Sequence, residues 1–268
     1  MSNGAFPLPP YYAFRFSNGP TWIESFPAKE LTDYAYGGAF VNQLNSGGGP
    51  PSLMAQINDY LIGKHFNVSG IADETMYVFW GGSNDIFALL ANTSSVTVAG
   101  VDTDLLKLAV TMPLLIADQI GKLIKAGANN ILIMLIPTSS NAPVGAALFD
   151  ASKRAVISAY TQALNDRIVA NVSAIAPPTV NLKFFDTFAF TQTMISHPGD
   201  FGLVNVTSPC LTNYEVFIDG LTGQKPIICY NPNEYLYWDG SHPTAKVHAV
   251  YASEVERYIG WGPYCKSY

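Results

Sequence analysis

Residues 131–136 constrain the fold more than any other segment, because all six are apolar and Pro137 follows them directly. A strand with one face in water alternates apolar and polar residues, whereas a strand covered on both faces does not. A run of this length, ended by proline, is typical of a strand rather than of a helix. The segment therefore predicts a strand in the middle of a sheet, with other elements packed on both of its faces.

Further predicted strands and helices alternate along the chain. Apolar strands are expected at 75–80 and 180–185, and amphipathic helices at 52–64, 102–126, 146–174 and 244–258. Ser52 is expected to cap the first helix, and Pro113 to kink or divide the second. Such alternation is typical of a parallel sheet wrapped by helices, an α/β sandwich. Because no repeat, low-complexity tract or linker divides the sequence, we expect one domain over residues 1–268.

The charge balance narrows the classes of partner. Only 13% of the residues are charged, the net charge is -6, and there is no basic run. Nucleic acid and anionic membranes both require clustered lysine or arginine, so neither is expected as a partner. The longest apolar stretches, such as 105–124, contain charged residues, so no transmembrane segment is expected. An apolar share of 49% also argues against disorder.

The cysteines bear on the redox compartment. Cys210 and Cys229 bracket an insertion that contains proline and glycine, and a disulfide between them would stabilise the fold by about 3 kcal/mol. The alternative is that all three cysteines, Cys265 included, are buried free thiols. An odd number of cysteines implies a free thiol or a partner outside these residues. No His/Cys cluster has the spacing of metal ligands, so no metal site is expected.

Other features of the sequence concern secretion. The N-terminus has neither the basic region nor the apolar stretch of a signal peptide. Four Asn-x-Ser/Thr glycosylation acceptors, in contrast, are typical of secreted proteins, and they begin at Asn67, Asn92, Asn171 and Asn205.

Polar residues follow the predicted strand 75–80 in the order Trp80-Gly-Gly-Ser-Asn-Asp85. Ligands bind beyond the carboxyl ends of parallel strands, and glycines allow the backbone to turn sharply there. Asn84 would offer an amide N–H to a developing oxyanion at this edge. The alternative is that Ser-Asn-Asp only caps the next helix. Ser83 is not a nucleophile of the Gly-x-Ser-x-Gly type, because that motif requires glycine at position 85.

A second polar set, Asp239-Gly-Ser-His242-Pro, precedes the last predicted helix. A carboxylate three residues before a histidine can hold one imidazole nitrogen and leave the other as a general base, as in a Ser-His-Asp triad. The alternative is an ordinary helix start with an incidental histidine. His65, His197 and His248 lack such neighbours, and we expect them on the surface or in the core.

These two sets, together with two earlier segments, resemble the GDSL ester hydrolases, also called SGNH hydrolases. Arg-Phe-Ser-Asn-Gly-Pro-Thr-Trp at 15–22 resembles the segment after that family's first block, and residues 34–39 resemble its second block. Gly-Ser-Asn-Asp at 82–85 and Asp-Gly-Ser-His-Pro-Thr at 239–244 resemble the third and fifth. The resemblance covers nearly the whole chain, and it implies a flavodoxin-like three-layer α/β/α sandwich.

The resemblance also assigns roles to individual residues. The N–H of Gly38, with Gly37 as the second choice, and the side chain of Asn84 would hold the oxyanion. His242 would be the catalytic base and Asp239 its orienting acid. No cofactor is implied.

One departure from the family pattern concerns the nucleophile. The family's serine lies in a Gly-Asp-Ser motif at the end of its first strand, and that motif occurs nowhere in this sequence. Neither Ser2 nor Ser17 has the required context. We therefore expect that the chain is truncated at its N-terminus, that the first strand of the sheet is missing, and that this chain is inactive or nearly so.

Taken together, these features predict a secreted, extracellular ester hydrolase, monomeric, that acts on a small-molecule or polysaccharide ester. From the family resemblance alone, acetyl esters of carbohydrate or other short-chain esters are the first expectation, and lipase- or phospholipase-like activity is the alternative. A serine-less binding protein or a gene fragment is the competing class. The aromatic residues near the N-terminus would either stack on a sugar or pack against the core; they are Tyr11, Tyr12, Phe14, Phe16 and Trp22.

Overall fold

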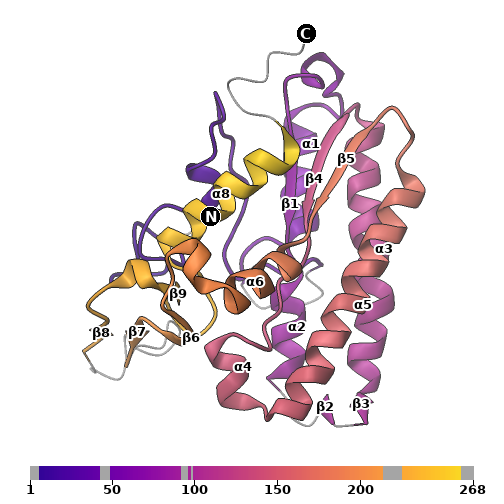
Figure 1. The fold of residues 1–268 in the computed structure, drawn as a ribbon. Helices are drawn as coiled ribbons and strands as arrows, with labels where there is room; N and C mark the ends of the chain where they lie inside the picture. Colours follow the sequence, from indigo (N-terminus) through magenta and orange to yellow (C-terminus); the bar gives the residue numbers. More distant parts are fainter. Residues whose placement is uncertain (1–5, 43–48, 92–95, 98, 214–224, 261–268) are drawn as a thin grey trace. The chain divides into compact units, whose positions relative to one another are not determined.

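A computed structural model of the chain describes residues 6–42, 49–91, 96–97, 99–213 and 225–260 (Figure 1). Its residues divide into two compact units. Unit 1 comprises Met1–Asp33, Asn141–Ala147 and Thr191–Tyr268, and unit 2 comprises Tyr34–Ser140 and Leu148–Phe190. The expectation of a single domain stays a prediction.

Unit 2 contains the parallel sheet that the sequence predicts. Its strands are β1 (Tyr77–Trp80), β4 (Asn130–Met134) and β5 (Asn181–Phe185), in the order β1-β4-β5 with every pair parallel (Figure 1). In the register, Phe79 lies beside Ile133, which lies beside Phe184. The predicted α/β sandwich is therefore confirmed by three strands close to their expected positions.

The central strand β4 is covered on both faces, as its apolar run predicts. Ile131 and Ile133 belong to the main core of unit 2, and Leu132, which points to the opposite face, is also only 1% exposed. β4 ends at Met134, two residues before the end predicted from the apolar run 131–136. Asn165 explains this, because its side chain accepts a hydrogen bond from Ile136 N and donates one to Ile136 O, both at 2.9 Å.

Three helices supply most of the apolar side chains that cover this sheet. They are α1 (Leu53–Gly63), α3 (Thr103–Lys125) and α5 (Ala151–Ile175), and α3 and α5 lie side by side (Figure 1). Ser52 caps α1 as predicted, with its hydroxyl accepting from Ala55 N. Pro113 does not divide α3, which runs through it as one helix.

The predicted helix 146–174 is wrong at its start. The structure contains a short helix, α4 (Pro143–Leu148), and then α5, which begins at Ala151. Asp150 causes the new start, because its carboxylate accepts a hydrogen bond from Lys153 N at 2.9 Å and so caps α5.

Unit 1 is built around α8 (Ala245–Ile259), a parallel pair of strands, β6 (Asn205–Pro209) and β9 (Tyr235–Tyr237), and an antiparallel pair, β7 (Leu211–Thr212) and β8 (Ile227–Ile228). Cys210 and Cys229 form a disulfide at this antiparallel pair, which confirms the predicted pairing. Cys265 lies outside the described residues.

The remaining elements are α2 (Ser83–Leu90), β2 (Val96–Thr97) and β3 (Gly100–Val101) in unit 2, α6 (Thr187–Ser196), which has residues in both units, and the 3-10 helices Trp22–Glu24, Ser69–Ile71, Pro198–Phe201 and Pro232–Glu234. Among the described residues, no helix is both long enough and apolar enough to cross a bilayer.

Candidate active site

Asp239 and His242 form a hydrogen-bonded pair in unit 1, on the turn between β9 and α8. The Nδ1 of His242 lies 2.7 Å from the Oδ2 of Asp239. The other carboxylate oxygen, Oδ1, accepts the backbone N–H groups of Ser241 at 2.8 Å and of His242 at 2.7 Å. A carboxylate on Nδ1 favours the tautomer that carries its proton there, so Nε2 is left as the basic nitrogen.

The turn itself is closed by backbone hydrogen bonds. Trp238 N donates to His242 O at 2.7 Å, and Val144 N, at the start of α4, donates to Gly240 O at 2.9 Å. Thr244 then caps α8 through its hydroxyl. The ordinary helix start that was the alternative interpretation is thus present, and it is the feature that fixes the histidine beside the carboxylate.

Burial and hydrogen bonding act in opposite directions on Asp239, whose exposed fraction is 6%. Burial raises the pKa of its carboxyl, but the charge and hydrogen bond of His242 and the two backbone N–H groups outweigh burial and lower it to about 2. Asp239 is therefore a carboxylate at neutral pH and can stabilise an imidazolium on His242.

The predicted oxyanion donors lie together in unit 2. Gly38 has a positive φ of 80°, which glycine adopts without strain. The side-chain amide of Asn84, in the first turn of α2, donates to the carbonyl of the next residue, Ala39, at 2.9 Å. An amide has two N–H donors, so one remains for a ligand. The structure thus brings Asn84 to the segment that contains Gly38.

Asp85, for which the sequence predicted no separate role, also connects the start of α2 to the segment that follows Gly38. Its carboxylate accepts the backbone N–H of Val41, with the nearer oxygen at 3.1 Å. Burial raises the pKa of Asp85 to about 6, against the effect of the Val41 hydrogen bond.

Gly82, the residue directly before α2, is required at its position for steric reasons. Gly82 has a φ of 107°, and a Cβ there would lie 2.7 Å from Cδ1 of Ile136. The sharp turn after β1 therefore requires glycine, as the sequence predicted.

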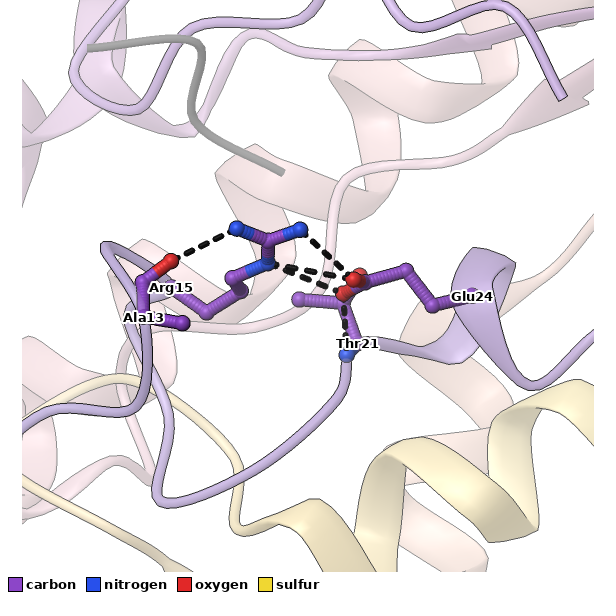
Figure 2. Close-up of polar contacts among 4 residues, drawn as sticks. All are labelled: Ala13, Arg15, Thr21 and Glu24. Atoms are coloured by element: carbon purple, nitrogen blue, oxygen red, sulfur yellow. Dashed lines mark hydrogen bonds and ion pairs between the residues drawn. The ribbon is translucent and has the colours of Figure 1, made fainter.

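The N-terminal segment of unit 1 forms a loop held by an ion pair (Figure 2). The guanidinium of Arg15 donates to the Glu24 carboxylate, with the shortest contact at 2.7 Å, and to the carbonyl of Ala13 at 2.6 Å. Glu24 also accepts from the backbone N–H and the hydroxyl of Thr21, both at 2.9 Å. Although burial raises the pKa of Glu24, these hydrogen bonds lower it to about 2. Residues 15–22, which carry part of the family resemblance, thus form one braced loop.

This loop contacts His242 and the turn that follows it. The ring of Phe16 stacks on the imidazole of His242, with centroids 4.7 Å apart. Ser17 is fully buried and donates to the carbonyl of Pro243 at 2.9 Å, a contact that agrees with its exclusion as nucleophile. Asn18 accepts from Ala245 N at 2.8 Å, at the start of α8. No local pattern in the sequence predicts these contacts, because their partners are more than 200 positions apart.

The other aromatic residues of this segment differ in exposure. Tyr11 and Trp22 are buried, at 3% and 5% exposed, so they pack inside unit 1. Tyr12 and Phe14 are exposed. Tyr11 also donates a hydrogen bond to Asp239 at 2.7 Å, which sequence analysis missed.

The three other histidines lie as expected. His65 and His197 are exposed. His248 is buried on α8, and burial lowers its pKa to about 3, so it is a neutral core histidine.

Comparison with known proteins agrees with these motifs. The family model described as "GDSL-like Lipase/Acylhydrolase" matches residues 9–255. The chain is 23% identical to a phosphatidylcholine-sterol acyltransferase of Aeromonas hydrophila, over 94% of this chain and 82% of that protein. It is 26% identical to a thermolabile hemolysin of Vibrio parahaemolyticus and 24% identical to a secreted effector protein of Salmonella typhimurium. These two matches cover 95% and 93% of this chain, and the chain spans only 58% and 56% of their lengths. With a match that extends over nearly all of its residues, the chain belongs to the GDSL-like lipase/acylhydrolase family.

Proposed function

We propose that this chain contains the acid–base pair and the oxyanion donors of an ester hydrolase or acyltransferase. The observation that carries the proposal is the 2.7 Å contact between His242 Nδ1 and Asp239 Oδ2, with the carboxylate buried and ionised. His242 Nε2 would take the proton of an attacking hydroxyl and return it to the leaving alcohol. The N–H of Gly38 and the amide of Asn84 would stabilise the oxyanion formed at the acyl carbon.

The nucleophile of this reaction is not assigned to a residue of this sequence. The Gly-Asp-Ser motif is not among its 268 residues, and Ser17 is buried against Pro243. General-base attack by water would leave a rate orders of magnitude below that of a complete Ser-His-Asp triad. We therefore expect this chain to hydrolyse esters slowly at best.

Chromogenic esters test the assignment. Hydrolysis of p-nitrophenyl acetate by the purified chain should be slow, and His242→Gln should reduce it to the buffer rate. His197→Gln is the matched control, because His197 is an exposed histidine of the same unit. A His242→Gln variant as fast as the wild type would refute the assigned role. Fast, His242-dependent turnover would instead show that a nucleophile lies within these residues.

The substrate class has two candidates. The family resemblance stated in the sequence analysis suggests acetyl or other short-chain esters, including those of carbohydrate. The relatives favour lipid esters, since one is named a phosphatidylcholine-sterol acyltransferase. A series of p-nitrophenyl esters from acetate to palmitate separates them, because the preferred acyl length gives the largest kcat/KM.

A second function, binding of esters without cleavage, is favoured by the missing Gly-Asp-Ser motif. It predicts saturable binding of an ester by calorimetry together with no hydrolysis that depends on His242.

Extracellular location and a monomeric state complete the proposal. The Cys210–Cys229 disulfide supports an oxidising compartment, and one relative is named a secreted effector. Of the glycosylation acceptors, Asn67 is exposed, Asn171 and Asn205 are half-buried, and Asn92 lies outside the described residues. Expression in a secreting host, followed by a mass measurement before and after glycosidase treatment, tests for glycans at these positions. Gel filtration tests the monomer.

A further inference from the structure

Tyr11 and Asp239 are 228 positions apart in sequence, yet their side chains meet inside unit 1. The hydroxyl of Tyr11 donates to Oδ2 of Asp239 at 2.7 Å. This is the same oxygen that lies 2.7 Å from His242 Nδ1. Both Tyr11 and Asp239 are buried, at 3% and 6% exposed, so water does not compete freely for this contact.

With Tyr11 in place, the Asp239 carboxylate has its full set of donors. Oδ1 accepts two backbone N–H groups, from Ser241 and His242, and Oδ2 accepts the His242 ring and the Tyr11 hydroxyl. An ionised carboxylate offers about four acceptor positions. All four are filled, so the carboxylate cannot rotate without losing hydrogen bonds.

The hydroxyl of Tyr11 is itself held in place by aromatic packing. Its ring makes edge-to-face contacts with Phe16, at 6.1 Å between centroids, and with Trp238, at 6.4 Å. Tyr11 and Trp238 form one buried cluster with Cys210, a member of the disulfide. Phe16 in turn stacks on His242. The same short segment therefore contacts the acid through Tyr11 and the base through Phe16.

We propose that Tyr11 is a positioning residue for the acid–base pair. The hydroxyl of Tyr11 orients the Asp239 carboxylate, and Tyr11 and His242 both draw on the negative charge of that carboxylate. Oδ2 accepts from two donors at once, and each donor withdraws negative charge from that oxygen. The hydrogen bond from His242 is therefore weaker than it would be if His242 were the sole donor to Oδ2. Removing the hydroxyl should therefore strengthen the Asp239–His242 hydrogen bond while leaving the carboxylate less firmly oriented. The inference rests on the proposed function only in naming this pair as the acid and base.

The test is the NMR signal of the His242 Nδ1–H proton, which moves downfield as its hydrogen bond strengthens. Tyr11→Phe keeps the ring and removes only the hydroxyl, and it should move this signal downfield. The signal is identified by its loss in His242→Gln. Tyr12→Phe is the matched control, because Tyr12 is the exposed neighbour of Tyr11, and it should leave the signal unchanged.

A second variant gives the opposite sign. Replacing Tyr11 by 3,5-difluorotyrosine makes the phenol a stronger donor, so the His242 signal should move upfield. A signal that stays at the wild-type position in both folded variants would overturn the proposal, because a purely structural tyrosine would behave in that way.

If Tyr11→Phe does not fold, the difluorotyrosine variant decides alone. The readout requires no turnover, so it is independent of the ester assay. Hydrolysis that is as fast in His242→Gln as in the wild type refutes the proposed function, whereas only the NMR signal refutes the role of Tyr11.

Discussion

Replacement of Asp239 by asparagine should destabilise the protein by an amount that depends on pH. The pKa of Asp239 falls from an ordinary value of 3.8 to about 2 in the fold. At 1.36 kcal/mol for each pKa unit, this difference corresponds to about 2 kcal/mol of stability at neutral pH. Because the folded pKa is the lower one, the contribution is full well above pH 4 and is lost as the pH falls through about 2. Between pH 6 and pH 3 it should decrease by about 1 kcal/mol.

Asparagine cannot ionise, so Asp239→Asn lacks this contribution at every pH. Urea unfolding followed by circular dichroism should show a loss of at least about 2 kcal/mol at pH 6 and a gap from the wild type smaller by about 1 kcal/mol at pH 3. Urea is uncharged and does not screen the interactions of the Asp239 carboxylate. Asp59→Asn, on the exposed face of α1, is the control and should show no such change. An equal gap for Asp239→Asn at both pH values would refute the reasoning, because the carboxylate would then not be held by its donors.

The other predictions concern the disulfide and unit 2. Replacing both Cys210 and Cys229 by serine should cost about 3 kcal/mol in urea unfolding, and a reducing agent should destabilise the wild type but not the variant. Burial raises the pKa of Asp85 to about 6, so the stability that this group contributes is full below about pH 4 and is lost as the pH rises through 6. Asp85→Asn should flatten that part of the stability curve; an unchanged slope would contradict the shift. Gly82→Ala should destabilise unit 2 by about 1–3 kcal/mol, because its φ is positive and the added Cβ meets Ile136. Thermal denaturation measures this, and an unchanged midpoint would show that the turn tolerates a side chain.

Periodicity and spacing were enough for the elements whose causes are local. The apolar run at 131–136 placed the central strand, and the cap at Ser52 placed the start of α1. The disulfide followed from two cysteines that bracket one loop. The spacing of three residues across a turn allowed the pairing of Asp239 with His242, and the family resemblance favoured it over an ordinary helix start. In each case the interacting groups are close in sequence, so a short window contains the physical reason.

The boundaries of elements were less predictable, because individual side chains, some of them distant in sequence, decide where an element ends or begins. β4 ends before Pro137 because Asn165 on α5 takes both backbone groups of Ile136. The helix expected at 146 begins at Ala151 because the Asp150 carboxylate caps it there. An apolar pattern alone does not distinguish one long helix from two helices that share a face.

For this protein the sequence by itself determined the α/β class and the family, and through the family resemblance it pointed to the proposed acid, base and oxyanion donors. Only the tertiary structure decided what surrounds them: Tyr11 on the carboxylate, Phe16 on the imidazole, and Asp85 on the backbone of Val41. The physical reason is that a hydrogen bond or a ring contact depends on distance in space, and the path of the chain brings together residues as much as 228 positions apart. No repeat, period or spacing in the sequence records such a contact.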